Sequence, residues 1–349
     1  MLTAPGKILT LLDPPLRLLD RVRWLLLKTL GPLAKPFIRR RELRVTSVGV
    51  ATVIVSLIAT LLFPFWLLAL GPIIWGVPHL VSDLRYLVFR PGLHRQAKLW
   101  LPVGIPLLLA GLGIHSITCG LLAVASVILL VTGTRFRKSL AITVLAMLWL
   151  GFAAMGDIAP FVFAHAHNFI AVLLWWCWRP RQWAATLWVP TLFLLATAAL
   201  TFGLCQPLPS VMQWSPSGMD AGYHIYALVP GASEPWGLRL VLLFCFAQAV
   251  HYGIWLRLIP EDDRPQPTPR TFSATWRALQ ADMGAPVLLA ALGIALFIGI
   301  WSVLDLASAR DGYFRLALFH GYLELAAGAY LFIHGAKVAE FQGSKATSL

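Results

Sequence analysis

Residues 46–70 read TSVGVATVIVSLIATLLFPFWLLAL and contain no charged side chain. An α-helix rises about 1.5 Å per residue, so about 20 apolar residues span the roughly 30 Å hydrocarbon core of a membrane. This stretch therefore predicts a transmembrane helix. Nine further apolar runs follow, at 72–89, 99–116, 117–133, 139–156, 158–178, 183–204, 236–258, 284–306 and 312–334. Together they predict an all-α protein, a polytopic membrane bundle of about ten transmembrane helices.

The composition of the whole chain agrees with this interpretation. Of its 349 residues, 58% are hydrophobic and only 12% are charged, whereas a soluble domain carries about 25% charged residues. A soluble globule of this size needs more charged surface than the chain supplies. The composition thus excludes an ordinary soluble enzyme, a disordered chain and a disulfide scaffold.

The excess of positive charge predicts the topology. The chain has 28 Lys and Arg against 15 Asp and Glu, a formal net charge of +13. In an alternating ten-span arrangement, all of these basic residues except Arg239, Arg310 and Arg315 fall on one side, which the positive-inside rule makes cytoplasmic. We therefore expect both termini inside, in the cytoplasmic membrane of a prokaryote. Topology accounts for the charge, so we expect no nucleic-acid partner.

The chain divides into a membrane domain with flanking segments. Residues 1–44 are basic, with leucines at helical spacing, and predict an amphipathic arm at the membrane surface that binds anionic lipid or docks a membrane-protein partner. Residues 45–336 form the ten-span domain. Within it we expect an external loop at 205–235 and a cytoplasmic linker at 259–283, and residues 337–349 form a cytoplasmic tail.

Five histidines lie within predicted spans, where imidazole and charged groups are costly and usually serve function. All five are on even-numbered spans: His79, His165, His167, His251 and His320. Two of them have a carboxylate four residues later, Asp83 after His79 and Glu324 after His320. Residues at this spacing share one face of a helix. The other four histidines are interpreted as loop or interfacial residues.

This pattern predicts a shared metal site. A carboxylate one turn from a histidine can ligate the same metal or accept the second imidazole N–H, so Asp83 and Glu324 are the candidate catalytic residues. The candidate ligands are His79, His251 and His320 together with His165 or His167. Those last two are about 200° apart on a helix, so only one of them faces a given site. Imidazole with carboxylate suits iron, zinc, copper or manganese, and iron is our first choice.

Three short motifs resemble a known family. Gly76-Val77-Pro78-His79-x-x-x-Asp83, Phe244-Cys245-Phe246-x-x-x-x-His251 and Leu318-Phe319-His320-x-x-x-Glu324 resemble signatures of the Brp/Blh family of membrane-embedded beta-carotene dioxygenases. The resemblance implies a multi-spanning helical protein that holds iron through histidines and splits a carotenoid double bond. The motifs cover about a tenth of the chain. Leu80 stands where the family has Gly, and Phe319 where it has Pro, which favours a distant relative with another substrate.

The residues are compatible with several functions. The first is a histidine-ligated metal oxygenase that takes a long apolar substrate, a carotenoid or another lipid, from the bilayer. The second is an ion- or proton-coupled transporter, because intramembrane His, Asp and Glu relay protons. The third is a haem-binding cytochrome with two axial histidines, and the fourth is a structural subunit of a membrane complex. We expect the first.

Overall fold

The computed structural model describes residues 13–334, and every regular element in that range is a helix. The expected all-α class is confirmed. The first twelve residues of the predicted arm and the predicted tail at 337–349 lie outside the described residues. The arm is thus described only from α2 (Asp13–Leu30) and α3 (Ala34–Arg39) onward.

Among the described residues, seven helical runs are long and apolar enough to cross a membrane. Three of the runs are single helices: Arg41–Leu62 (α4), Ala285–Leu304 (α17) and Leu306–His334 (α18). Three others each contain one long helix: Pro64–Phe89 begins with α5 (Pro64–Asp83), Ala184–Thr201 ends with α11 (Trp188–Thr201), and Trp236–Asp262 begins with α14 (Trp236–Gly253). The run Arg135–Cys177 contains α9 (Arg135–Met155) and α10 (Ala159–Cys177). Seven apolar runs of this length indicate an integral membrane protein. They do not reproduce the count of ten.

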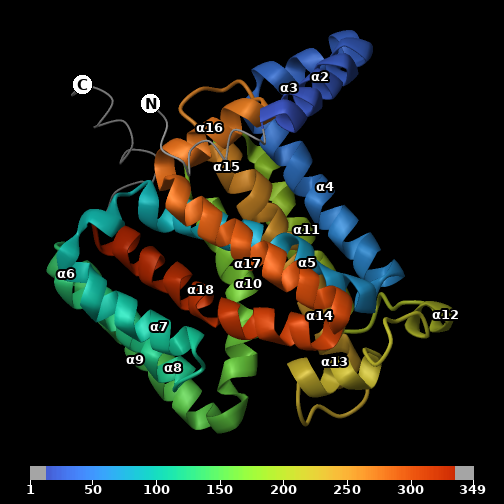
Figure 1. Ribbon diagram of the computed structural model, residues 1–349. Helices are drawn as coiled ribbons and strands as arrows, with labels where there is room; N and C mark the ends of the chain where they lie inside the picture. The colour runs from blue at the N-terminus through green and yellow to red at the C-terminus, as the bar shows by residue number, and fades with distance from the viewer. Residues whose placement is uncertain (1–12, 335–349) are drawn as a thin grey trace.

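Helix length explains most of the difference in count. The predicted spans 99–116 and 117–133 correspond to the shorter apolar helices Ala97–Gly111, which ends in α7 (Ile105–Gly111), and Ser116–Leu130 (α8). Fifteen residues of α-helix are about 22 Å long, less than the hydrocarbon core. The run Arg135–Cys177 contains two helices, because Gly156 has a φ of +55° and the chain turns back there (Figure 1).

The first predicted boundary is misplaced. The apolar stretch 46–70 is divided at Phe63, whose φ of −143° and ψ of 44° end α4, and α5 begins at Pro64. Proline favours the first turn of a helix, where its missing N–H costs nothing. By contrast, Pro72 and Pro78 lie inside α5 without ending it. Apolarity alone does not mark a break between two adjacent apolar helices.

The two predicted non-membrane segments carry structure of their own. Residues 205–235 contain α12 (Pro209–Met212) and α13 (Ala221–Leu228), and the segment 259–283 contains α15 (Ile259–Asp262) and α16 (Phe272–Met283). Asp20 of α2 accepts hydrogen bonds from the first backbone N–H groups of α16, at 2.6 Å from Phe272 N and 3.1 Å from Ser273 N. The basic arm is therefore docked on the segment that follows α15.

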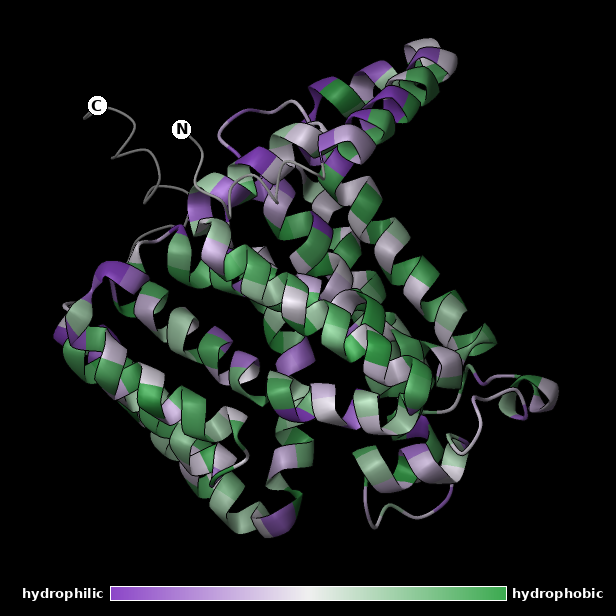
Figure 2. Cartoon of the chain, in the orientation of Figure 1, coloured by the Kyte–Doolittle hydropathy of each residue, from purple (hydrophilic) through white to green (hydrophobic). Residues whose placement is uncertain are grey.

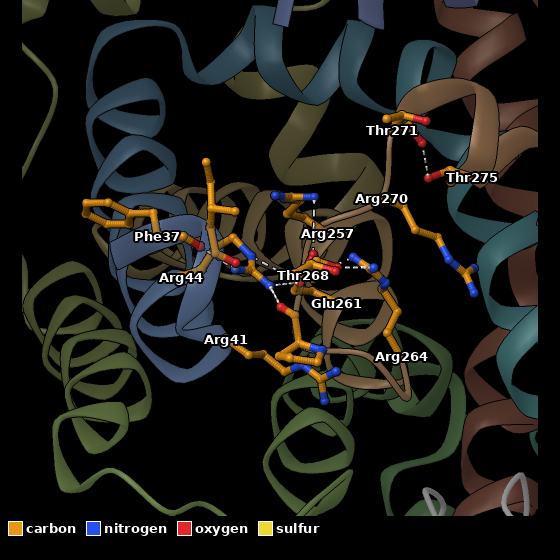
Figure 3. Close-up of polar contacts among 12 residues, drawn as sticks. Phe37, Arg41, Arg44, Arg257, Glu261, Arg264, Thr268, Arg270, Thr271 and Thr275 are labelled. Carbon is orange, nitrogen blue, oxygen red and sulfur yellow. Dashed lines mark hydrogen bonds and ion pairs between the residues drawn. The ribbon is translucent and has the colours of Figure 1, made fainter. Parts of the chain in front are cut away.

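One buried carboxylate joins the beginning of α4 to this same region. Glu261 accepts a hydrogen bond from Nε of Arg44 at 3.0 Å, and it pairs with Arg264 at 3.6 Å and with Arg257 at 3.8 Å. Figure 3 shows these arginines turned toward Glu261. Hydrophilic residues gather at this end of the molecule, over α2, α3 and α16, whereas the long helices are mostly hydrophobic (Figure 2).

The interior of the bundle is built from α5, α10, α14 and α18, each of which packs against two of the others (Figure 1). Other helices present apolar side chains outward: Phe297 and Ile300 of α17 are about two-thirds exposed, at 64% and 65%. Such a surface is compatible with contact with lipid, because its side chains are apolar and the backbone polar groups are paired within the helix. Polar side chains inside this bundle, in contrast, must find partners in the protein or bind a ligand.

Candidate metal centre

Four histidines from the four central helices meet inside the bundle. Ring centroids are 4.9 Å apart for His79 and His320 and for His167 and His320, 5.1 Å for His167 and His251, and 5.3 Å for His79 and His251. His79 belongs to α5, His167 to α10, His251 to α14 and His320 to α18. The cluster therefore forms only when all four helices pack together.

Three of the histidines have ring nitrogens close enough together to hold a metal ion. His79, His251 and His320 each offer a ligand atom within 4.8 Å of the other two, and all three side chains are buried. Their Nε2 atoms have no hydrogen-bond partner in the described part of the chain. Because buried polar groups are costly without a partner, these orphaned nitrogens fit a bound metal ion.

A hydrogen bond at the opposite ring nitrogen sets the tautomer of His320. Nδ1 of His320 contacts the carbonyl oxygen of Ala317, which can only accept, so Nδ1 carries the proton and Nε2 keeps its lone pair. Nδ1 of His79 lies 3.3 Å from the Tyr313 hydroxyl. When His79 donates to that oxygen, its Nε2 is likewise available to a metal.

Two carboxylates border the histidines. Asp83 Oδ2 lies 3.9 Å from Nε2 of His79, and Glu324 Oε1 lies 3.6 Å from Nε2 of His251. Both side chains are fully buried. Asp83, Glu324 and His320 form a second set of ligand atoms within 4.8 Å of one another. The glutamate one turn after His320 thus reaches the histidine of a different helix.

The backbone is irregular just after the site residues of α5 and α14. A π-helical turn, Leu84–Phe89, follows Asp83 directly, and a second one, Ile254–Leu258, begins three residues after His251. Such turns are rare in proteins overall, and those that occur are often found at functional sites. The second turn carries Trp255, whose Nε1 donates to Glu324 Oε1 at 2.7 Å.

Close packing around Gly76 positions Tyr313. A Cβ atom at Gly76 would lie 2.4 Å from the Tyr313 ring, so only glycine permits this approach. Tyr313 is seven residues before His320, on the same face of α18, and its hydroxyl contacts His79. The Gly-Val-Pro-His segment of α5 therefore packs on the helix that supplies another histidine.

An apolar cavity of about 180 Å³ reaches the site. His79, His167, His251 and His320 form part of its lining. The remaining lining is predominantly apolar and aromatic and comes from α10, α13, α14 and α18, with Phe161, Phe163, Leu228, Phe244 and Phe314 among its members. Some lining residues, among them Pro160 and Phe161, are only partly buried.

The structure separates the two histidines of α10. His167 joins the cluster, whereas His165 Nδ1 hydrogen-bonds the carbonyl of Phe161 at 2.9 Å and its ring packs 4.9 Å from the ring of Phe244. The other candidate residues, His79, Asp83, His251, His320 and Glu324, lie together with His167. The choice between His165 and His167, left open by the sequence, is made by the rotation of α10.

Sequence reasoning missed several residues that contact the cluster, and these include Trp255, Tyr313 and Tyr252, whose ring lies 4.8 Å from that of His79. Spacing offered a signal for two of them, since Trp255 is four residues after His251 and Tyr313 seven before His320.

Comparison of the chain with protein-family models, curated proteins and solved structures gives no match. The geometry of this site is therefore the basis for a functional assignment.

Proposed function

We propose that this protein is a membrane-embedded, metal-dependent oxygenase that acts on a long apolar substrate, a carotenoid or another lipid. The observation that carries the proposal is the meeting of four histidines from four helices, three of them buried, in the lining of an apolar cavity. Purely structural histidines would be expected to have their ring nitrogens paired within the protein, and several of these do not.

The donor set fits a first-row transition metal. His79, His251 and His320 would hold the ion, with His167 as a fourth imidazole ligand. Histidine with carboxylate is the ligand chemistry of non-haem iron oxygenases, which is why iron is our first choice. When bound, iron would supply redox activation of dioxygen beside a double bond of the substrate.

The side chains around the cluster hold the imidazoles in place. Glu324 lies against His251 and is itself fixed by Trp255, while Asp83 and Tyr313 flank His79. Such partners select the tautomer and raise the basicity of a ligand histidine. The apolar lining of the cavity excludes water from the reacting region and accommodates a segment of a hydrocarbon chain.

The resemblance to the Brp/Blh family belongs to the same proposal. The histidines and carboxylates of the three resembling motifs are His79, Asp83, His251, His320 and Glu324, and all five lie in this one cluster. We take the chain to be a distant relative of that family. The substitutions at Leu80 and Phe319, both beside ligand histidines, favour a substrate other than beta-carotene.

We also propose that the basic end of the molecule, with α2 and α16, faces the cytoplasm of a prokaryotic cell, and that both termini lie on that side. α9 and α10 would cross separately, and the short helices α7 and α8 would enter and return as a hairpin. A hairpin leaves the parity of crossings unchanged, whether or not it reaches the far side. Reporter fusions at both ends would each report a cytoplasmic location, and an external signal from either end would contradict the assignment.

The enzymatic proposal is tested with purified protein in lipid nanodiscs, loaded with Fe²⁺ under anaerobic conditions and then exposed to oxygen. We expect oxygen uptake and cleaved or oxygenated products, detected by mass spectrometry, from a panel that contains beta-carotene and unsaturated lipids. His320→Ala should abolish both signals, and His165→Ala should retain them. Iron-loaded protein that consumes no oxygen with any panel member would contradict an oxygenase function.

A further inference from the structure

A second group of buried polar side chains, outside the histidine cluster, lies where α13 meets α18. Arg310 of α18 is 1% exposed. Its Nη1 donates to Asp311 Oδ1 at 2.8 Å, while Nε and Nη2 have no hydrogen-bond partner among residues 13–334. An unpaired buried guanidinium edge is costly, so this arginine is arranged for a ligand or imposes a penalty on the fold.

The unpaired edge of Arg310 has a defined recognition geometry. Nε and Nη2 form one side of the planar guanidinium, where two N–H groups point in parallel. That fork matches the two oxygens of a carboxylate in a bidentate pair. The available acid, Asp311, is already engaged on Nη1 and accepts a further hydrogen bond from the Tyr223 hydroxyl at 2.9 Å. It therefore leaves the other edge of the guanidinium open.

His224 of α13 is the second member of the group. It is 0% exposed, and neither ring nitrogen has a hydrogen-bond partner within the described chain. Its ring stacks on Phe65 with centroids 5.3 Å apart. Burial, together with the positive charge of Arg310, lowers the pKa of His224 to about 3, although Asp220 opposes this. The imidazole is then neutral at pH 7 and offers one N–H donor.

Neighbours of these two side chains line the apolar cavity. The Arg310 guanidinium carbon is 4.6 Å from the ring centroid of Phe314, and Phe314 lines the cavity. Leu228, four residues after His224 on the same face of α13, lines it as well. The lining of the cavity thus joins the histidine cluster to residues that neighbour both unpaired side chains.

We propose that Arg310 and His224 bind the carboxylate of a single-chain, unsaturated acid whose hydrocarbon chain runs through the cavity toward the histidines. This inference rests on the proposed function in taking the cavity as the substrate site, and it names the substrate class. Arg310 and His320 are ten residues apart on α18, about 15 Å along the axis. A carboxylate held at Arg310 therefore places the middle of the chain, and not its acid end, beside the histidines.

The test is a binding measurement on the purified full-length chain in a neutral detergent, by isothermal titration with oleate, methyl oleate and acetate. We expect oleate to bind at least tenfold more tightly than methyl oleate. Acetate should bind weakly, because the chain as well as the carboxylate contributes. Arg310→Gln should remove the preference for oleate and leave methyl oleate binding within twofold of the wild type. His224→Ala should reduce the preference about threefold.

Arg315→Gln is the matched control, because Arg315 is an exposed arginine on the same helix, and it should keep the full preference. Equal affinities for oleate and methyl oleate in the wild type would overturn the proposal without need of any variant. A preference that persists in a folded Arg310→Gln protein would overturn it too, as would displacement of oleate by phosphatidylglycerol at equal concentration. The titration is repeated after chelation, so a protein that binds no metal still reports on the carboxylate site.

Discussion

Trp255 donates a hydrogen bond from Nε1 to Oε1 of Glu324 at 2.7 Å, and that same oxygen lies 3.6 Å from Nε2 of His251. The indole therefore fixes the carboxylate that borders His251, one of the proposed metal ligands. His251 and Trp255 are one turn apart on one chain segment, whereas Glu324 comes from α18. The contact joins the two helices at the site itself.

Trp255→Phe tests the role of this indole N–H. It retains most of the packing volume and removes the donor, so the protein should still fold while Glu324 loses its orientation. Loss of an outer partner typically weakens metal binding by about 10- to 100-fold. Chelator competition on the purified variant measures this. Trp149→Phe, at an exposed position on α9, should have unchanged affinity, and a Trp255 variant that also has unchanged affinity would show that the hydrogen bond is dispensable.

The pair His165 and His167 gives a test on one helix. His167→Ala should lower metal affinity, because its ring meets those of His251 and His320 at about 5 Å. His165→Ala should leave the affinity unchanged, because that side chain bonds Phe161 and packs on Phe244. Both variants are assayed by metal titration. The reverse order of effects would mean that α10 is rotated relative to this structure.

Gly76→Ala tests the close approach between α5 and α18. The added methyl would lie 2.4 Å from the Tyr313 ring, and overpacking of this kind costs about 1–3 kcal/mol. We expect a lower thermal midpoint and weaker metal binding, since Tyr313 contacts His79. Gly293→Ala, where the added atom meets nothing within 4 Å, should stabilise α17 slightly, because alanine favours helix over glycine. A thermal midpoint for Gly76→Ala at or above the wild-type value would contradict the packing.

Glu261→Gln tests the cluster at the basic end of the molecule (Figure 3). It would leave the buried Arg44 without its counter-charge, and breaking one partner of a buried pair costs about 3–5 kcal/mol. We expect a large loss of unfolding free energy in detergent and no change in metal affinity for the fraction that remains folded. Asp157→Asn, at an exposed position, is the control. Equal stability of the two variants would show that Glu261 does not join α4 to this region.

The sequence predicted the helical class and identified the histidines as candidate site residues, because both follow from local composition and spacing. It placed one boundary wrongly, at Phe63–Pro64, since two adjacent apolar helices read as one run. It also counted two helices of about 22 Å as full spans. The choice between His165 and His167 depends on how α10 rotates against its neighbours, and the sequence of one helix does not contain that rotation.

Other residues became recognisable only through contacts between distant segments. In the sequence, Tyr313 and Trp255 do not differ from other aromatic residues. Their contacts with the site depend on the packing of α5, α14 and α18. His224 was expected to be a loop histidine, yet α13 buries it completely. Arg310 was expected to be one of only three basic residues on the outer side, and its unpaired guanidinium edge is visible only in the packed structure.

The central claim is that the histidines from four helices hold one metal ion. The most direct test is the metal content of the purified wild-type protein after metal loading and desalting, measured by elemental mass spectrometry. His320→Ala and His165→Ala are measured in the same way. We predict about one transition-metal ion per chain in the wild type and in His165→Ala, and almost none in a folded His320→Ala. A folded wild-type protein that retains no metal, or a His320→Ala variant that retains as much as the wild type, would contradict the account.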